Sequence, residues 1–173
     1  GTLVIANGGN ATVNSDTLGE KKIDTNIRIE DGGTLTFTGS GSDNLNYRNN
    51  SRTIYLKGNA KLDFDESRQT MGFWTVDMTG GVVSGTNSTA SMDFHNSASL
   101  KAHAAENASA ENPTISSISA HIRSKSNGTM SVIVDENAQL NMSGQLTLDR
   151  PTEKRGNGKL LVNGGTGVSQ NIN

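Results

Sequence analysis

The densest group of acidic side chains in the sequence is Asp63, Asp65 and Glu66. Carboxylate oxygens are the ligands that calcium prefers, so this cluster is the candidate site for a structural calcium ion. Asp63 and Asp65 are also two residues apart, which in one strand places both side chains on the same face. Two carboxylates are the minimum for glycoside hydrolysis. The alternative, which we favour, is that Lys61, Asp63 and Asp65 form the solvated face of an amphipathic strand.

The other residue types that often serve in catalysis or metal binding, namely cysteine, histidine and serine, do not form a recognisable catalytic or metal-binding pattern in the sequence. The absence of cysteine excludes disulfides and Cys-ligated metals. His95, His103 and His121 lack the spacing of metal ligands, so we expect each to be a satisfied surface histidine. A histidine could still make binding depend on pH, because its charge changes between about pH 5 and 8. No Ser-His-Asp arrangement stands out among the many serines, and the glycines do not open a phosphate-binding loop before a helix. We therefore predict no catalytic residue, no cofactor and no enzyme activity.

Aromatic side chains that point outward are the candidates for ligand binding. Trp74 shares its face with Val76 and Met78, so we expect it in the core, while Phe73 on the other face points outward. Tyr55 points outward between two apolar neighbours. A polar stretch precedes Tyr55 in the sequence, and Lys57 lies beside it. The candidate ligand patch comprises Tyr47, Arg48, Arg52, Tyr55 and Phe73. The alternative is a set of scattered surface aromatics, which are normal in soluble proteins.

Composition limits the class of protein. The length of 173 residues fits one domain, and a net charge of −2 excludes a strongly basic nucleic-acid surface across the whole chain. No run of eighteen apolar residues is present, so we predict no membrane insertion in this segment. Gly, Asn, Ser and Thr make up 77 of the 173 residues. Together with the low net charge, this composition favours an ordered fold with a thin core and many turns.

Any such surface must be carried by the elements that a short, recurring sequence motif forms along the chain. A pair of small or amide residues is followed by alternating apolar and polar residues, as in residues 33–37, 59–64, 89–94, 127–132 and 137–142. Asn and Gly turn the chain at low steric cost, and the alternation then places the apolar residues on one face of a short strand. The pattern therefore predicts an all-β chain with regularly spaced turns.

The spacing of the copies distinguishes a solenoid from a sandwich. Small residues before the strands fall at positions 11, 33, 60, 90, 98, 128, 138 and 158, so the steps are either 20 to 30 or 8 to 10 residues. The longer steps match one coil of a solenoid and the shorter steps match one side of a coil. We predict a right-handed parallel β-helix of about seven coils over residues 1–173. Residues 100–113 break the pattern as a short helix or a loop insertion, and we favour an insertion.

The repeated Asn-Gly-x-Leu-x-Phe style, free of cysteine and poor in aromatics, resembles the β-solenoid adhesin regions of bacterial surface proteins. These include autotransporter passengers and the pectate-lyase-like adhesive domains of lactobacilli. The Asp-Asp, Gly-His-Gly and Arg-Ile-Lys strings of the polygalacturonases, which share the fold, are not in the sequence. The resemblance implies a secreted rod at the bacterial cell surface. Both ends fall inside the repeat pattern, so we expect the chain to be a fragment of a longer surface protein.

The sequence thus predicts an adhesin domain that binds host or environmental glycan or glycoprotein, such as mucin or matrix proteins, through the outer face of the rod. Three alternatives remain open. The chain could be a spacer without a ligand of its own, or a self-association module that uses unpaired strand edges. It could also be a polysaccharide lyase or hydrolase that depends on Asp63 and Asp65.

Overall fold

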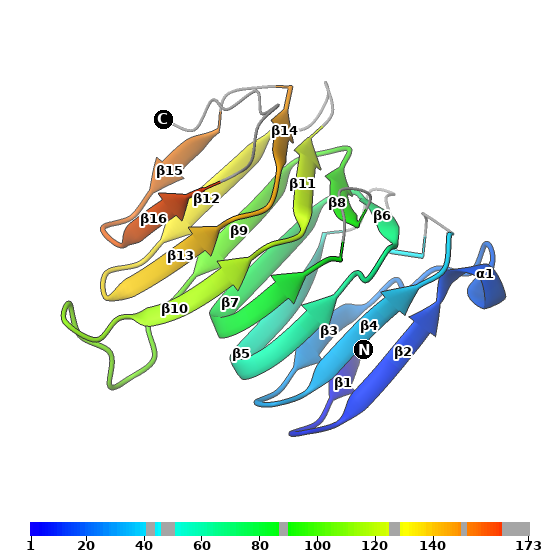
Figure 1. Cartoon of the computed structure of the whole chain (residues 1–173), viewed down its shortest axis with the longest axis horizontal. Helices are drawn as coiled ribbons and strands as arrows, with labels where there is room; N and C mark the ends of the chain where they lie inside the picture. The colour runs from blue at the N-terminus through cyan, green and yellow to red at the C-terminus, as the bar shows by residue number, and fades with distance from the viewer. Residues whose placement is uncertain (41–43, 46–50, 87–89, 125–128, 150–151, 164–173) are drawn as a thin grey trace.

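The computed structural model describes residues 1–40, 44–45, 51–86, 90–124, 129–149 and 152–163. Its parallel strands stack as a β-solenoid of about six turns, with almost no helix, which confirms the predicted all-β parallel β-helix. Figure 1 shows the stack rising from the first strands at one end to β15 and β16 at the other. The right-handed sense of winding stays a prediction.

Each full turn has three faces. The first face is formed by β1 (Thr2–Ile5), β3 (Asn26–Ile29), the first half of β5 (Arg52–Asp63), the first half of β7 (Trp74–Ser84), β9 (Ala98–Ala102), β12 (Met130–Val134) and β15 (Glu153–Arg155). The second face is formed by β2 (Asn10–Asn14), β4 (Thr34–Thr38), the second halves of β5 and β7, β10 (Thr114–Ile118), β13 (Ala138–Met142) and β16 (Lys159–Val162). Because β5 and β7 bend around the corner between these faces, the two faces join into one 12-stranded sheet.

The third face is a separate sheet of four strands. It contains β6 (Arg68–Met71), β8 (Ser91–Phe94), β11 (His121–Ser124) and β14 (Leu146–Leu148). In the first turns its place is taken by the helical turn α1 (Ser15–Leu18) and by an isolated parallel bridge between Ile23 and Leu45. The Asn14 side chain accepts hydrogen bonds from the backbone N–H groups of Asp16 and Thr17 and so caps α1.

The strand register gives the length of each turn directly. Successive partners on the first face are separated by 24 residues (Thr2 to Asn26), 27 (Ile27 to Ile54), 22 (Arg52 to Trp74), 24 (Thr75 to Ser99), 32 (Ala98 to Met130) and 22 (Ser131 to Glu153). Among the described residues, seven strands on the first face therefore enclose six turns, compared with the about seven coils expected from the sequence. The recurring motif falls on all three faces, which explains why its spacing alternates.

The long turn contains the stretch that breaks the sequence pattern. Residues 103–113 form a loop without helix at the corner between β9 and β10. It projects beside β10 (Figure 1). Of the two predictions for this segment, the loop insertion is confirmed and the helix is wrong. Solenoid corners accept such insertions because the strand pairing on either side is unchanged: β9 pairs with β12, and β10 pairs with β13.

Inward-facing apolar side chains fill the narrow interior. Along β5, Ile54, Leu56 and Leu62 are buried, whereas Tyr55, Lys57 and Lys61 between them are exposed. Inward residues stack on those of the next turn, and the rings of Phe37 and Phe64 are parallel, with centroids 5.7 Å apart. A thin core is sufficient because each turn packs only against its neighbours.

Candidate functional site

One row of outward side chains occupies the same register position on every strand of the first face. Here we call it the central row, and it consists of Val4, Arg28, Tyr55, Asp77, Lys101, Ile133 and Arg155. Neighbouring strands lie about 4.8 Å apart, so consecutive members of the row are direct neighbours along the rod. The fold thereby assembles a contiguous surface from residues more than twenty positions apart in the sequence.

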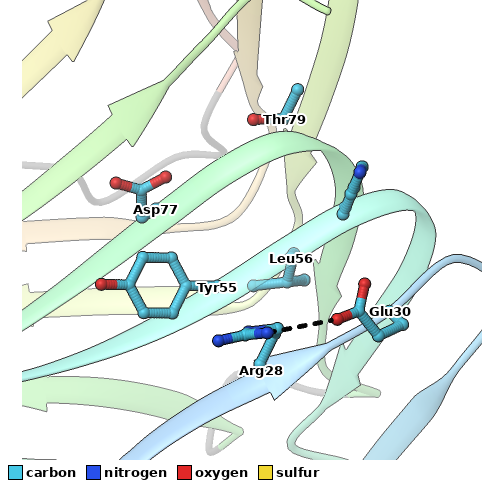
Figure 2. Close-up of a pocket in the computed structure, with 7 residues that line it drawn as sticks. Arg28, Glu30, Tyr55, Leu56, Asp77 and Thr79 are labelled. Carbon is cyan, nitrogen blue, oxygen red and sulfur yellow. Dashed lines mark ion pairs between the residues drawn. The ribbon is translucent and has the colours of Figure 1, made fainter. Parts of the chain in front are cut away.

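Tyr55 is the aromatic member of the central row, and it lies between charges of opposite sign. Its side chain is 38% exposed, and its register neighbours are Arg28 on β3 and Asp77 on β7. A shallow pocket of about 260 Å³ is lined by Arg28, Glu30, Tyr55, Leu56, Lys57, Asp77 and Thr79. Figure 2 shows the Tyr55 ring between the Arg28 and Asp77 side chains, with the ion pair from Arg28 to Glu30 below it. We call this site the Tyr55 pocket.

The chemistry of the Tyr55 pocket suits a polar ligand with one apolar face. Arg28 Nη1 lies 3.7 Å from Glu30 Oε1, and the Arg28 side chain is still 52% exposed, so this surface ion pair leaves guanidinium donors accessible. Lys57 adds a second exposed cation, while Asp77 offers carboxylate acceptors and Thr79 a hydroxyl. An aromatic ring flanked by donors and acceptors of both signs can stack on a ring and hydrogen-bond its substituents.

The structure separates the ligand patch predicted from the sequence. Tyr47 and Arg48 lie outside the described residues. Arg52 is held by an ion pair of 2.9 Å to Asp24, and its backbone N–H donates to the carbonyl oxygen of Phe73 at 3.0 Å. Phe73 is half-buried in the bend before β7. In register, Arg52 lies three positions before Tyr55 and Phe73 lies four, so both are about 10 Å or more away along the strand.

Arg52 instead lines a pocket of its own. Of the two aromatic residues beside it, Phe73 is half-buried and Trp74 lies in the core. This second pocket, of about 250 Å³, is formed by Gly1, Asp24, Thr25, Asn26, Ser51 and Arg52. Trp74 is 1% exposed and packs in the core, as predicted. Among the members of the predicted patch that the structure describes, Tyr55 is the one exposed at the centre of a face.

The acidic cluster does not have the geometry expected from the sequence. β5 ends at Asp63, and Asp65 follows in a turn with a positive φ of 47°. The prediction that both carboxylates project from one strand is therefore wrong. Asp63 Oδ1 accepts hydrogen bonds from the Asp65 backbone N–H and the Ser84 hydroxyl, and Oδ2 pairs with Lys61 at 3.5 Å. Within the described residues, no three His, Asp or Glu side chains are grouped to hold a metal ion, Asp63, Asp65 and Glu66 included.

The histidines differ from one another in environment. His121 is only 7% exposed, and its Nε2 lies 2.9 Å from the Thr147 hydroxyl, so the expectation of a surface histidine is wrong there. His103 lies between two carboxylates: its Nε2 is 3.2 Å from Asp77 Oδ1 and its Nδ1 is 2.6 Å from Asp135 Oδ2. Partial burial alone would lower the pKa of His103. The hydrogen bond with Asp135, together with the charge and hydrogen bond of Asp77, outweighs burial and raises that pKa above its ordinary value.

Sequence reasoning did not identify Arg28, Asp77 and His103 as parts of one surface. A signal for the first two was present, because each central-row residue lies between two inward-facing residues, as in residues 27–29, 54–56 and 76–78. Aligning these triplets would have placed Arg28, Tyr55 and Asp77 side by side. His103 gave no such signal, because it lies just beyond the strand end, where the insertion begins.

Comparisons with known proteins give no relative: no family model, no curated protein and no solved structure matches the chain. Among the described residues, no helix is long and apolar enough to cross a membrane.

Proposed function

We propose that this chain is the ligand-binding part of an extracellular bacterial surface adhesin, and that it binds glycan or glycoprotein at the Tyr55 pocket. The observation that carries the proposal is the exposed Tyr55 ring, placed in register between Arg28 and Asp77. Sugars present an apolar C–H face and a rim of hydroxyls, which matches a ring flanked by donors and acceptors. Host glycans, mucin and matrix proteins are the partners that this chemistry serves.

Rigidity of the scaffold supports the same proposal. Arg28, Tyr55 and Asp77 belong to strands whose inward neighbours are buried, so their backbone positions are fixed before a ligand arrives. A preformed site avoids the entropy of ordering loops on binding, which favours weak polar contacts. We propose binding without turnover at this site.

The test is binding of the fragment to neutral oligosaccharides, mucin and matrix proteins, with variants of Tyr55. Tyr55→Ala removes the ring and should weaken binding about tenfold or more, as truncation of a central aromatic contact does. Tyr55→Phe keeps the ring and should retain most of the affinity. Ile115→Ala is the control, because this residue is 51% exposed on the second face, away from the pocket.

Two results would overturn the proposal. One is the absence of saturable binding to every ligand class tested. The other is binding that Tyr55→Ala leaves unchanged. The first result would favour the second candidate function, a spacer that holds another domain away from the cell, which the unbroken stacking of six turns also supports.

A further inference from the structure

Asp77 belongs to two groups of side chains at once. On one side it lines the Tyr55 pocket with Tyr55 as its register neighbour. On the other side its Oδ1 contacts His103 Nε2 at 3.2 Å. The opposite ring nitrogen of His103 contacts Asp135 at 2.6 Å. The imidazole therefore joins three successive turns, through β7, the end of β9 and the end of β12.

This arrangement is suited to holding a proton rather than a metal. The two nitrogens of an imidazole point in different directions, so the carboxylates that contact them lie on opposite sides of the ring and do not converge on one point. When both nitrogens carry protons, His103 donates to Asp135 and to Asp77 together. The doubly protonated ring is thus the form that the two carboxylates stabilise.

We propose that protonation of His103 controls whether Asp77 is available to a ligand in the Tyr55 pocket. The inference rests on the proposed function of that pocket and adds its regulation by pH. In the charged ring, Nε2–H donates to Asp77 and holds the carboxylate against His103. When the ring is neutral, the remaining proton stays on Nδ1, which makes the shorter contact with Asp135. Nε2 then presents a lone pair to Asp77 Oδ1, and the repulsion releases the carboxylate towards the pocket.

Charged and polar groups from several strands surround the ring. Lys101, on β9 two residues before His103, is the register neighbour of Asp77 and remains available to pair with it. Thr79 on β7 is uncharged. Glu30 and Lys57, across the pocket, have opposite charges. His103 is the group in this cluster whose pKa is raised above an ordinary value near 6.5.

The sign of the effect follows from this geometry. The pKa of His103 is raised by its two carboxylate partners, so the ring changes charge above pH 6.5. Affinity for a ligand that uses Asp77 as an acceptor should increase as the pH rises through that value. Linkage requires the reciprocal effect, in which bound ligand lowers the pKa of His103. A tenfold gain in affinity corresponds to a decrease of one unit in that pKa.

The test measures the affinity of neutral oligosaccharides ending in galactose, mannose or N-acetylglucosamine from about pH 5 to about pH 9. These probes do not titrate, so any pH dependence belongs to the protein. We expect the natural chain to bind about tenfold more tightly at the upper end. His103→Gln, which has no titrating ring, should bind with a flat profile. His95→Gln, the same change on the third-face side of the molecule, should keep the profile of the natural chain.

Each outcome distinguishes the two proposals. Binding that is flat with pH in the natural chain, or that keeps its slope in His103→Gln, overturns the switch and leaves the binding function standing. No binding at any pH overturns both. An NMR titration of the His103 ring without ligand adds an independent readout: Asp77→Asn should lower its pKa, and an unchanged pKa would contradict the contact on which the switch depends.

Discussion

At the scale of single residues, His103 contributes to stability as well as to the surface. Its pKa in the folded chain is raised above the unfolded value near 6.5 by Asp135 and Asp77. A raised pKa means that the folded state binds the proton more tightly, so the stabilisation is complete below about pH 6.5 and is lost as the pH rises through the folded pKa.

The corresponding prediction is a decrease in the free energy of unfolding as the pH rises above about 6.5, measured by urea denaturation. His103→Gln should remove this slope, because no group then gains a proton on folding at that position. His95→Gln serves as the matched control and should keep the slope. A slope that persists in His103→Gln would show that another group is responsible.

At the scale of elements, one buried side chain replaces missing strand pairing on the third face. Gln69 on β6 is fully buried; its Oε1 accepts from the backbone N–H groups of Asn44 and Leu45, and its Nε2 donates to the hydroxyls of Ser15 and Ser67. Since no strand precedes β6 on this face among the described residues, the amide satisfies backbone groups that a β-ladder would otherwise pair.

Gln69→Leu should therefore destabilise the chain by at least about 2 kcal/mol, because it leaves two buried N–H groups without their acceptor. Gln139→Leu is the matched control. Gln139 is half-buried on the second face, and its amide donates to the Asn141 side chain, so its loss should stay within about 0.5 kcal/mol. Chemical denaturation of both variants gives the comparison, and equal losses would refute the special role of Gln69.

The corner between the first and second faces depends on residues with positive φ. Gly8, Gly32, Gly58 and Gly80 all have φ between 61° and 84° there, and a Cβ at Gly80 would lie 2.7 Å from the carbonyl oxygen of Gly58 in the turn before. A Cβ at Gly8 meets nothing within 4 Å. The close stacking of one corner on the next explains the difference.

Gly80→Ala should destabilise the fold by about 1–3 kcal/mol more than Gly8→Ala, since both substitutions strain the backbone but only the first also forces a contact. Thermal denaturation of the two variants measures this difference. If they proved equally stable, the corner would be able to shift without cost.

Particular residues show how far the sequence alone could lead. Alternation around Leu35 and Phe37, or around Ile54 and Leu56, was enough to predict the strands, the buried face and the burial of Trp74, because a period of two determines side-chain direction. The structure has about six turns where the sequence indicated about seven coils, because turns of 27 and 32 residues are longer than the others, of 22 to 24. The length of each turn determines which outward residues become neighbours, and these lengths vary from 22 to 32 residues. Because of this variation, the contact between Asp77 and His103 could not be predicted from the sequence.

At the scale of the whole molecule, nearest-neighbour packing predicts graded stability along the rod. Central turns, such as those of β5, β7 and β9, contact a turn on each side, whereas β1 and β2 pair on one side only among the described residues. Stability in such a stack is a sum of turn and interface contributions. Amide hydrogen exchange should accordingly be slowest in β5 and β7 and faster in β1, β2 and β16. Uniform protection along the chain would instead indicate a single cooperative unit.

The parallel register also determines how the rod would respond to mechanical force. Hydrogen bonds between turns run along the rod axis, so tension applied to its two ends loads the interfaces between turns in series. The weakest interface then opens first, and the chain unwinds one turn at a time instead of yielding all at once. Each released turn of 22 to 32 residues extends to roughly 75–110 Å of slack chain. A rod built in this way absorbs a pull by lengthening in steps while the remaining turns, and the side chains they display, stay in place.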